Sequence, residues 1–512
     1  MADSRGEGVG NGGITVPGTR DPGDATFAGI AALARAYAAG DLDPVDVVEA
    51  HLARLERLQP HLNAFRTVDA GGARQAATES SRRWAGTNPR SPLDGVPVSI
   101  KDIVAVAGWS TSSGSATTDL EHLADEDSPP VARLREAGAV LLGMTTTPEF
   151  GWKGMTDSPL CGVTANPWDL TRTPGGSSGG AGASLAAGVG TFAFGTDGGG
   201  SIRIPASYCG LVGLKPTTGR VPQHPNDSLF ALVAGGPLAR SVLDAATVLN
   251  ELVEPDARDP WSLPFEGRDW RLGLDDGVRG MRIGVTTMLG GASVSDDEIT
   301  SAVRRTADRL ADLGAQVTEA GSVFDPLRPT FEAHWKAGFA HLLRAVPADR
   351  HHLLDPGFRS LAEAGMNVEV EEMYAAQVAR TRLAATMRSF HASVDMLLTP
   401  TMPTLAPPRD TVYHSEGFDR WSDAVPFTVP FNLTGQPAAS VPVAVSESGL
   451  PIGIQLVGSH HREDLVLRVA RSVEAGAGFD QPHPRLRAAM AGWDATAGVA
   501  GAVPTTRQVA PQ

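Results

Sequence analysis

The chain has 512 residues, of which 42% are hydrophobic and 20% are charged, and its formal net charge at pH 7 is −15. This composition is sufficient for a large buried core, and the negative charge argues against a nucleic-acid-binding surface. Two cysteines are too few for a disulfide framework or a cysteine-based metal site, and we expect neither a metal nor a cofactor.

No apolar run approaches the length of a membrane span, and no apolar segment follows the polar N-terminus as a signal peptide would require. We therefore expect a cytoplasmic protein that does not contact a membrane. The Gly-, Asp- and Pro-rich residues 1–24 predict a mobile N-terminal tail. Residues 25–485 are expected to form one domain, and the Ala/Gly-rich residues 486–512 a poorly ordered C-terminal tail.

The first clear element along the chain is a helix that begins at Pro44. Asp43 is a suitable N-cap, and proline is favoured in the first turn of a helix. Apolar residues then recur at helical spacing, at Val47, Val48, Leu52, Leu55 and Leu58.

A strand–helix–strand unit is predicted further along the chain. Residues 282–285 predict a short strand, and Ser295 with Glu298 three residues later forms a capping box at the start of a helix. Gly314 ends this helix, and residues 316–318 resume as a strand. The buried face of the helix is expected to contain Ile299, Val303, Leu310 and Leu313.

Near the end of the chain, residues 441–445 and 452–457 predict an antiparallel hairpin, because a short Ser/Gly-containing loop joins them. The strand–helix–strand unit instead favours a sheet with helices on both faces. Together these elements predict an α/β fold: a single large domain whose mixed, mostly parallel β-sheet is covered by helices on both faces.

The most informative stretch covers residues 174–201, where Ser177 and Ser201 stand in glycine-rich loops on either side of a run of small residues. Glycine adopts backbone conformations that other residues reach only at a cost, and a Gly-Gly-Gly-Ser loop can direct several N–H groups at one point. Such a loop suits the binding of an oxyanion. Upstream, a strand-like segment that begins at Val96 leads to Lys101.

These three pieces resemble the amidase signature family, whose members hydrolyse amide bonds with a Ser-Ser-Lys triad. The resemblance extends from about residue 26 to about residue 480. It includes, in chain order, residues 92–102, 147–151, 166–169, 174–206, 209–217, 398–401 and 449–458.

The resemblance implies that Ser201 is the nucleophile, Ser177 the relay serine and Lys101 the base. It also implies a cis peptide bond between Gly176 and Ser177. A serine hydroxyl needs an adjacent base, and lysine serves as one only when neutral, so burial must lower the pKa of Lys101. The implied oxyanion hole consists of the backbone N–H groups of Gly198, Gly199, Gly200 and Ser201.

Charged neighbours of the triad need separate interpretations. Asp102 follows Lys101, but successive side chains of a strand point to opposite faces, so the two need not pair. The chain has 43 Lys and Arg residues, only four of them lysines, and arginine cannot serve as a base at neutral pH. A lysine at position 101 therefore favours a lysine-specific role. Asp197 and Arg203 are expected to form a structural pair, and Lys215 to be structural.

The same glycine-rich segment also allows a different assignment of the nucleophile. Residues 176–180 also match the Gly-x-Ser-x-Gly pattern of α/β-hydrolases, which would make Ser178 the nucleophile and His460 or His461 the base. The motif is short and the region is rich in Gly and Ser, so this alternative is weaker. We expect Ser178 to hydrogen-bond around the relay loop.

The substrate is predicted less directly, from bulky residues in segments that line the pocket in the family. Each of them could equally pack in the core; if they face the site, they favour aryl or long aliphatic small-molecule amides. The candidate substrate-binding residues are Phe150, Trp152, Met155, Trp335 and Phe427, with Phe331, Phe339 and Trp421 as further bulky neighbours.

Two other functions remain open at this point. Carbamate (urethane) cleavage requires the same triad and oxyanion hole. A glutamine-hydrolysing amidotransferase subunit belongs to the same family, but residues 334–336 and 425–428 lack the arginine and the aspartate that hold glutamine there. This favours an amide hydrolase that acts alone, as a monomer or a homodimer.

Overall fold

A computed structural model describes residues 25–225, 229, 231–413, 421–479, 482–493 and 507–508. The expected N-terminal tail, residues 1–24, lies outside the described residues, as do residues 494–506 and 509–512 of the expected C-terminal tail. Helix α15 (Pro484–Ala491) crosses the expected domain boundary at residue 485. Leu486 in this helix and Trp493 after it are both buried, so this part of the chain packs against the domain.

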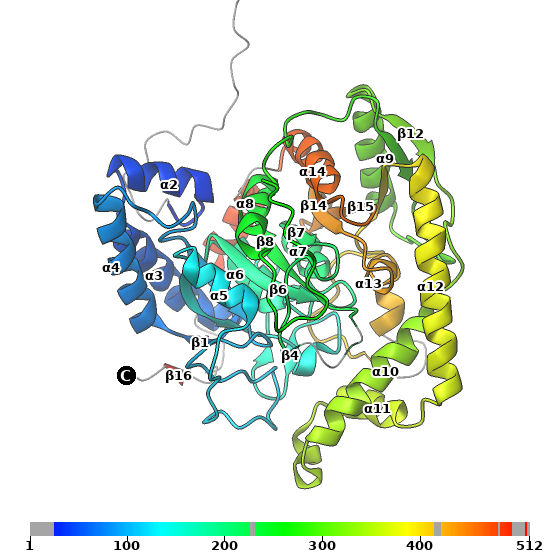
Figure 1. Ribbon diagram of the computed structural model, residues 1–512, viewed down its shortest axis with the longest axis horizontal. Coiled ribbons are helices and arrows are strands. Elements are labelled where there is room, and N and C mark those ends of the chain that lie inside the picture. Colours follow the sequence, from blue (N-terminus) through cyan, green and yellow to red (C-terminus); the bar gives the residue numbers. More distant parts are fainter. Residues whose placement is uncertain are drawn as a thin grey trace, which may run out of the picture.

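Twelve strands within the described residues form one mixed sheet in the order β12-β9-β13-β15-β14-β7-β8-β6-β2-β3-β1-β16 (Figure 1). Their bounds are β1 (Phe65–Val68), β2 (Pro97–Lys101), β3 (Val140–Thr145), β6 (Phe192–Asp197), β7 (Val212–Lys215), β8 (Ala234–Ala239), β9 (Arg282–Val285), β12 (Gln316–Glu319), β13 (Met396–Pro400), β14 (Ala438–Val445), β15 (Pro451–Gly458) and β16 (Arg507–Gln508). The predicted hairpin is confirmed as β14 and β15.

The mixed sheet and its cover of helices, expected from the sequence, are confirmed. Parallel pairs lie in the two flanks, β12-β9-β13 on one side and β6-β2-β3 on the other. The centre, from β13 through β15, β14, β7 and β8 to β6, is antiparallel throughout. The expected parallel pairing is therefore found in the flanks of the sheet, on either side of an antiparallel centre.

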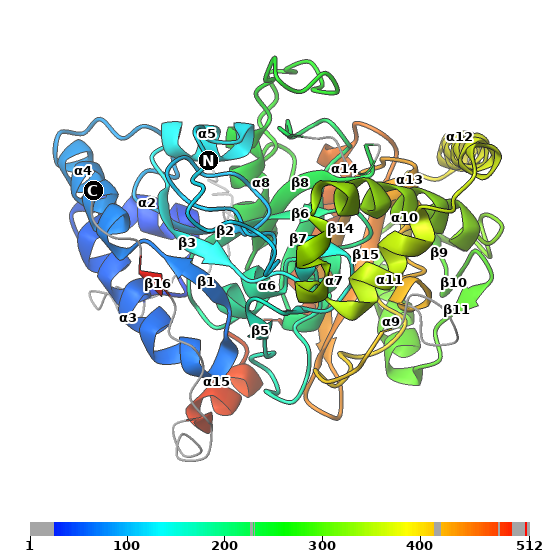
Figure 2. The ribbon, with the colours of Figure 1, turned by 90° about the horizontal axis from the view of Figure 1, so that it is seen from below.

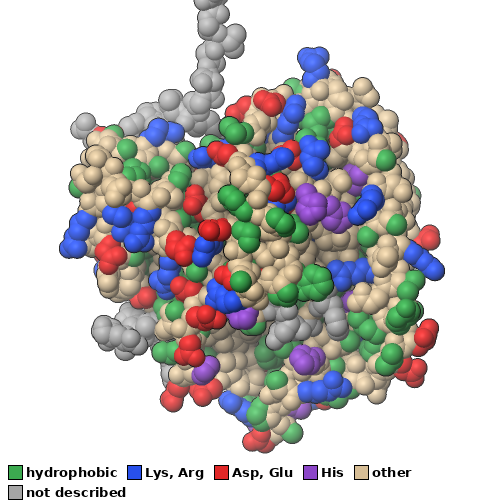
Figure 3. Space-filling model, in the orientation of Figure 1, with side chains coloured by type: hydrophobic (Ala, Val, Ile, Leu, Met, Phe, Trp, Pro, Cys, Tyr) green, Lys and Arg blue, Asp and Glu red, His purple; other side chains and the backbone are tan. Residues whose placement is uncertain are grey.

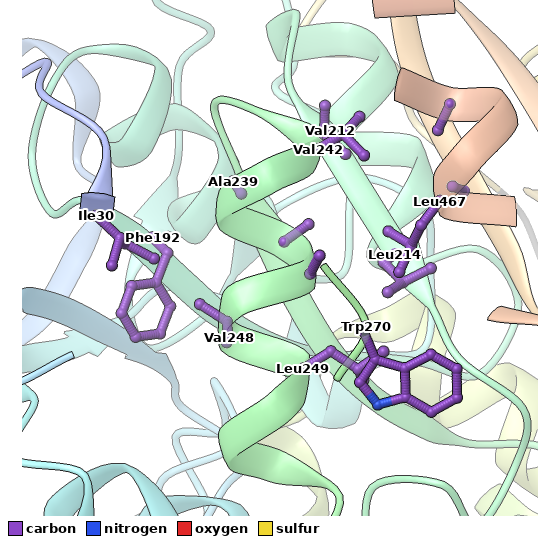
Figure 4. Packing of buried hydrophobic residues seen from close by; sticks show 14 of the residues in the cluster. Ile30, Phe192, Val212, Leu214, Ala239, Val242, Val248, Leu249, Trp270 and Leu467 are labelled. Carbon is purple, nitrogen blue, oxygen red and sulfur yellow. The ribbon is translucent and has the colours of Figure 1, made fainter. Parts of the chain in front are cut away.

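Two hydrophobic clusters lie on opposite faces of the sheet, because successive side chains of a strand point to opposite sides. In β6, Phe192 and Phe194 join one cluster, and Ala193 between them joins the other. The first cluster includes side chains of α2 (Ile30–Ala39), α5 (Pro129–Glu136), α8 (Val242–Leu252), α9 (Asp297–Asp312) and α14 (Glu463–Ala477). Figure 4 shows part of this packing, with Val248 and Leu249 of α8 among the labelled residues of the first cluster.

The second cluster includes side chains of α6 (Gly179–Ala186), α7 (Arg203–Cys209), α10 (Arg328–Ala345), α11 (Pro356–Gly365), α12 (Val370–Ser393) and α13 (Pro430–Leu433). A third, smaller cluster joins α3 (Pro44–Leu62) and α4 (Ala70–Ala85) to β1 and β3. Three short 3-10 helices are η1 (Glu149–Gly151), η2 (Ala348–Leu353) and η3 (Trp421–Ala424). Helix α12 lies at the edge of the molecule in both views (Figures 1 and 2).

The predicted helix starts can be compared with the observed caps. Asp43 caps α3 as predicted, since its carboxylate accepts a hydrogen bond from the N–H of Val45 at 2.8 Å. The predicted capping box is displaced by one residue, because Asp296, and not Ser295, caps α9. Leu313, expected on the buried face of this helix, is 43% exposed, because α9 ends at Asp312 and the chain turns there.

The outer surface carries charges of both signs. Lys and Arg side chains are interspersed with Asp and Glu side chains on the face shown in Figure 3. No helix within the described residues is both long enough and apolar enough to cross a bilayer.

Candidate active site

Lys101 is the last residue of β2, and its side chain leaves the sheet on the face opposite to that of Val98 and Ile100. The lysine is buried, with 1% of its surface exposed. Its Nζ lies 2.7 Å from Ser177 Oγ and 2.9 Å from Thr196 Oγ1. The structure thus brings the expected base and relay serine together, although 76 residues separate them in the chain.

The surroundings of Lys101 favour the neutral amine. Burial lowers the pKa of Lys101 to about 7, although the negative charge of Asp197 opposes this shift. Asp102 does not pair with the lysine: its carboxylate lies 2.6 Å from Arg66 Nε and accepts a hydrogen bond from the N–H of Ser112 at 2.9 Å. The expectation that Asp102 points away from Lys101 is confirmed.

Ser177 lies in a tight loop that precedes α6. The Gly176–Ser177 peptide bond is cis, as the resemblance implies. Gly175 has a φ of +82°, and a Cβ atom on Gly176 would lie 2.6 Å from the carbonyl oxygen of Met155. Side chains at these two positions would therefore displace the serine from the lysine.

Ser201 follows β6 and precedes α7, and 7% of its surface is exposed. Its carbonyl oxygen accepts a hydrogen bond from the N–H of Ser178 at 3.2 Å, which holds the two serine loops together. Its hydroxyl makes no hydrogen bond to Ser177 or to any other described residue. Of the two hydrogen bonds that a relay requires, the one between Lys101 and Ser177 is present, and the one between Ser177 and Ser201 is absent in this structure. Catalytic hydrogen bonds often tighten only when substrate is bound.

The Gly198–Ser201 loop presents fewer N–H donors than the sequence suggests. The N–H of Gly200 donates to Asp197 Oδ1 at 2.7 Å and is occupied. The N–H groups of Gly198, Gly199 and Ser201 have no acceptor among the described residues. The expected set of four donors is therefore reduced to three in this structure.

Asp197 and Arg203 form the expected structural pair beside Ser201. Arg203 Nη2 and Nε lie 2.8 and 2.9 Å from the two carboxylate oxygens, and both side chains are fully buried. Burial alone would raise the pKa of Asp197, but the Arg203 guanidinium holds it well below its usual range. Asp197 is therefore ionised and can accept hydrogen bonds from the loop.

The candidate substrate-binding residues divide into two groups. Trp152, Met155, Trp335 and Phe427 are all buried, so their bulk fills the core. Phe150 alone of the five is half-buried, with a φ of +50° and its ring centroid 4.9 Å from that of Phe358.

The buried aromatic residues still shape the loop that carries Ser201. A Cβ atom on Gly198 would lie 3.3 Å from the Trp335 ring, and one on Gly199 would lie 3.2 Å from Trp421 and 3.3 Å from Phe331. These rings therefore pack directly on the two glycines. Their effect on the site is to support the loop from the side of α10 and η3.

Sequence reasoning missed two threonines of the site. Thr196 Oγ1 accepts a hydrogen bond from Lys101 Nζ at 2.9 Å, and Thr428 Oγ1 donates to the carbonyl oxygen of Gly199 at 2.7 Å. Thr196 immediately precedes Asp197 on β6, but nothing in the local pattern distinguishes it. Thr428 lies 229 residues from Gly199 in the chain, so no local signal could have found it.

The α/β-hydrolase alternative is not supported by the geometry. Ser178 Oγ donates to the carbonyl oxygen of Thr196 at 3.3 Å. His460 Nε2 lies 2.8 Å from the carbonyl oxygen of Thr434, and His461 contacts Thr217 through its own N–H. Neither imidazole contacts Ser178. Its hydroxyl, expected to hydrogen-bond around the relay loop, instead bonds to the neighbouring strand β6.

The described residues contain no group of three or more His, Cys, Asp or Glu side chains placed to hold a metal ion. Cys209 is buried and Cys161 is half-buried, and both are free thiols.

Known proteins share this sequence and fold. The sequence profile of the amidase family matches residues 46–467. An acylamidase from Rhodococcus erythropolis is 35% identical over 451 residues, which cover 86% of this chain and 94% of that protein. A glutamyl-tRNA(Gln) amidotransferase subunit from Synechococcus sp. (strain CC9902) is 35% identical over 87% of this chain and 96% of its own.

Among solved structures, a bacterial aryl acylamidase of the amidase signature family superposes with a TM-score of 0.82 at 29% sequence identity. The superposition covers 91% of this chain and 99% of the other.

Proposed function

The chain belongs to the amidase signature family of enzymes that hydrolyse C–N bonds, and from this premise we propose that it cleaves neutral aryl or apolar amides through an acyl-enzyme on Ser201. The observation that carries the proposal is the contact of 2.7 Å between the buried Lys101 amine and Ser177 Oγ, next to the loop that bears Ser201. A neutral amine, a relay hydroxyl and unoccupied backbone donors are the groups that acyl transfer requires.

In the proposed reaction, Ser201 Oγ attacks the carbonyl carbon while its proton passes through Ser177 Oγ to the Nζ of neutral Lys101. The N–H groups of Gly199 and Ser201 stabilise the developing oxyanion. Lys101 then returns the proton through Ser177 to the leaving nitrogen, and the C–N bond breaks. Water attacks the acyl-ester by the same route, which releases the carboxylic acid and restores Ser201.

The preference for apolar groups rests on the residues that remain half-buried beside the triad. Gly151 lies next to Ser177: a Cβ atom placed on this glycine would lie 3.1 Å from Ser177 Oγ and 3.1 Å from Ile103 Cδ1. A Cβ atom placed on Gly198 would lie 3.3 Å from Val233 Cγ2. Ile103, Phe150 and Val233 are all half-buried. An aryl or aliphatic group of the substrate could bury against these side chains.

The similarity to the amidotransferase is the observation in favour of a second candidate function. In place of the arginine and aspartate expected for glutamine binding, His334 is buried with its Nδ1 2.7 Å from the carbonyl oxygen of Thr330, and the hydroxyl of Thr428 bonds to Gly199. Neither supplies a charge for a zwitterionic substrate. Carbamates present the same carbonyl to the same groups and are included among the test substrates.

The test is a panel of p-nitroanilides, carboxamides, aryl carbamates and glutamine, assayed with the purified chain alone. We expect release of amine from neutral anilides or amides and no reaction with glutamine. Ser201→Ala should lower kcat by about 10⁴-fold or more, whereas the matched control Ser178→Ala should retain most of the activity. Mass spectrometry should locate a fluorophosphonate adduct on Ser201.

Two results would contradict the proposal. An adduct on Ser178, with full activity in Ser201→Ala, would assign the nucleophile to the other serine. If glutamine is the single substrate that reacts, and it reacts only when a copurified partner protein is present, the amidotransferase function would be favoured.

A further inference from the structure

The peptide group between Gly199 and Gly200 is held at both of its ends. Its carbonyl oxygen accepts a hydrogen bond from Thr428 Oγ1 at 2.7 Å, and its N–H donates to Asp197 Oδ1 at 2.7 Å. Asp197, Gly200 and Thr428 are all buried. With both ends bonded, the plane of this peptide cannot rotate without breaking a buried hydrogen bond.

The two neighbouring peptide groups carry the N–H groups of Gly199 and Ser201, which have no acceptor among the described residues. Their directions depend on the plane of the peptide that lies between them. We propose that Thr428 is a positioning residue of the oxyanion hole, whose hydroxyl keeps these two N–H groups directed at the reacting carbonyl oxygen. This inference rests on the proposed function, in which Ser201 is the nucleophile.

The third glycine of the loop makes this contact possible. Gly200 has a φ of +127°, and a Cβ atom there would lie 2.5 Å from Thr428 Oγ1 and 2.8 Å from Thr428 Cβ. Thr428 therefore occupies the space that any side chain at position 200 would need. The close approach of threonine and loop explains why this position requires glycine.

Thr428 is itself fixed by the network that holds Asp197. Arg203 Nη1 donates to the carbonyl oxygen of Thr428 at 2.9 Å. One turn later in the same segment, Asn432 Nδ2 donates to the carbonyl oxygen and to Oδ1 of Asp197, at 2.7 and 2.9 Å. Arg203 thus holds the backbone of Thr428, and the same buried polar network holds Asp197 at the other end of the peptide.

The two ends of the Gly199–Gly200 peptide group differ in how their hydrogen-bond partners are held. Asp197 is held by Arg203 and Asn432, so its position does not depend on the threonine hydroxyl. The carbonyl oxygen of Gly199, in contrast, accepts only the hydrogen bond from Thr428 among the described residues. Removal of this hydroxyl should therefore release one end of the peptide and leave the ion pair intact.

The test compares Thr428→Val, which is similar in shape and lacks the hydroxyl, with Thr428→Ser, which keeps the hydroxyl. We expect Thr428→Val to lower kcat by about 10- to 100-fold, because small misplacements of oxyanion donors are costly, with KM changed by less than about twofold. Thr428→Ser should retain most of the wild-type kcat, because it keeps the hydroxyl. The pH at which kcat/KM levels off should not change, because the contact between Lys101 and Ser177 is not altered.

The rate of fluorophosphonate labelling of Ser201 provides a readout that needs no substrate. If wild-type protein is not labelled on Ser201, the proposed function fails. If wild-type protein is labelled and Thr428→Val is labelled equally fast with unchanged kcat, the role of Thr428 is overturned. A rise in KM alone would overturn it as well, since this would indicate substrate contact. Should Thr428→Val not fold, Thr428→Ala removes the hydroxyl without adding a methyl group, and the same outcomes apply.

Discussion

Two buried lysines stand at corresponding places in the sheet, Lys101 at the end of β2 and Lys215 at the end of β7. Strands β6 and β8 lie between them (Figure 2). Burial lowers the pKa of each to about 7. By pKa alone, either amine would be neutral enough to act as a base.

The partners of the two amines differ. Lys101 Nζ contacts the hydroxyl groups of Ser177 and Thr196, whereas Lys215 Nζ donates to the carbonyl oxygen of Pro216 at 2.9 Å. A carbonyl oxygen has no proton to give, so Lys215 has no group to deprotonate. The comparison teaches that a lowered pKa reports burial, and that a base is identified by the proton within its reach.

The largest expected difference between the lysines is in catalysis. Lys101→Met and Lys101→Arg should each lower kcat by about 10³-fold or more, because methionine accepts no proton and guanidinium keeps its own. The matched variant Lys215→Met should keep kcat within about threefold of wild type. Steady-state kinetics on the preferred anilide or amide measures all three variants, with circular dichroism to confirm folding. Substantial activity in Lys101→Arg would mean that the residue supplies charge and does not accept a proton.

The pH dependence of the reaction should distinguish the lysines more finely. If neutral Lys101 is the base, kcat/KM should rise about tenfold per pH unit below pH 7 and level off above it. Lys215→Met should reproduce this profile. The measurement is kcat/KM from pH 5 to 9 for wild type and for this variant. If the inflection is lost in Lys215→Met, the titrating group is Lys215, and Lys101 is not the base.

The smallest expected effect concerns stability, where the two lysines should behave alike. The folded pKa of each lies below the unfolded value of about 10.4, so between pH 7 and 10 the unfolded chain binds more protons and stability rises with pH. Replacing either lysine by methionine should reduce the gain between pH 7 and 9.5, on the order of 2 kcal/mol per lysine. Urea unfolding at both pH values tests this. A full gain retained in either variant would show that its lysine is solvated in the folded protein.

Much of this protein could be predicted from neighbouring residues in the sequence. The cap at Asp43, the hairpin of β14 and β15 and the glycine-flanked serines are local features, because propensity, capping and turn formation act over a few residues. The separation of Asp102 from Lys101 also followed from the alternation of side chains along a strand. The family resemblance then supplied the proposed roles of Lys101, Ser177 and Ser201.

Only the tertiary structure decided which groups of the site are available. The N–H of Gly200 appears in the sequence as one donor among several, but Asp197 occupies it. Trp152 and Phe427 appear as pocket residues by their bulk, but both are buried in the core. Thr428 reaches Gly199 from a distant segment. The physical reason is the same for all of them: a hydrogen bond or a packing contact is settled by whichever group other elements bring within a few ångströms, and the sequence order does not record that distance.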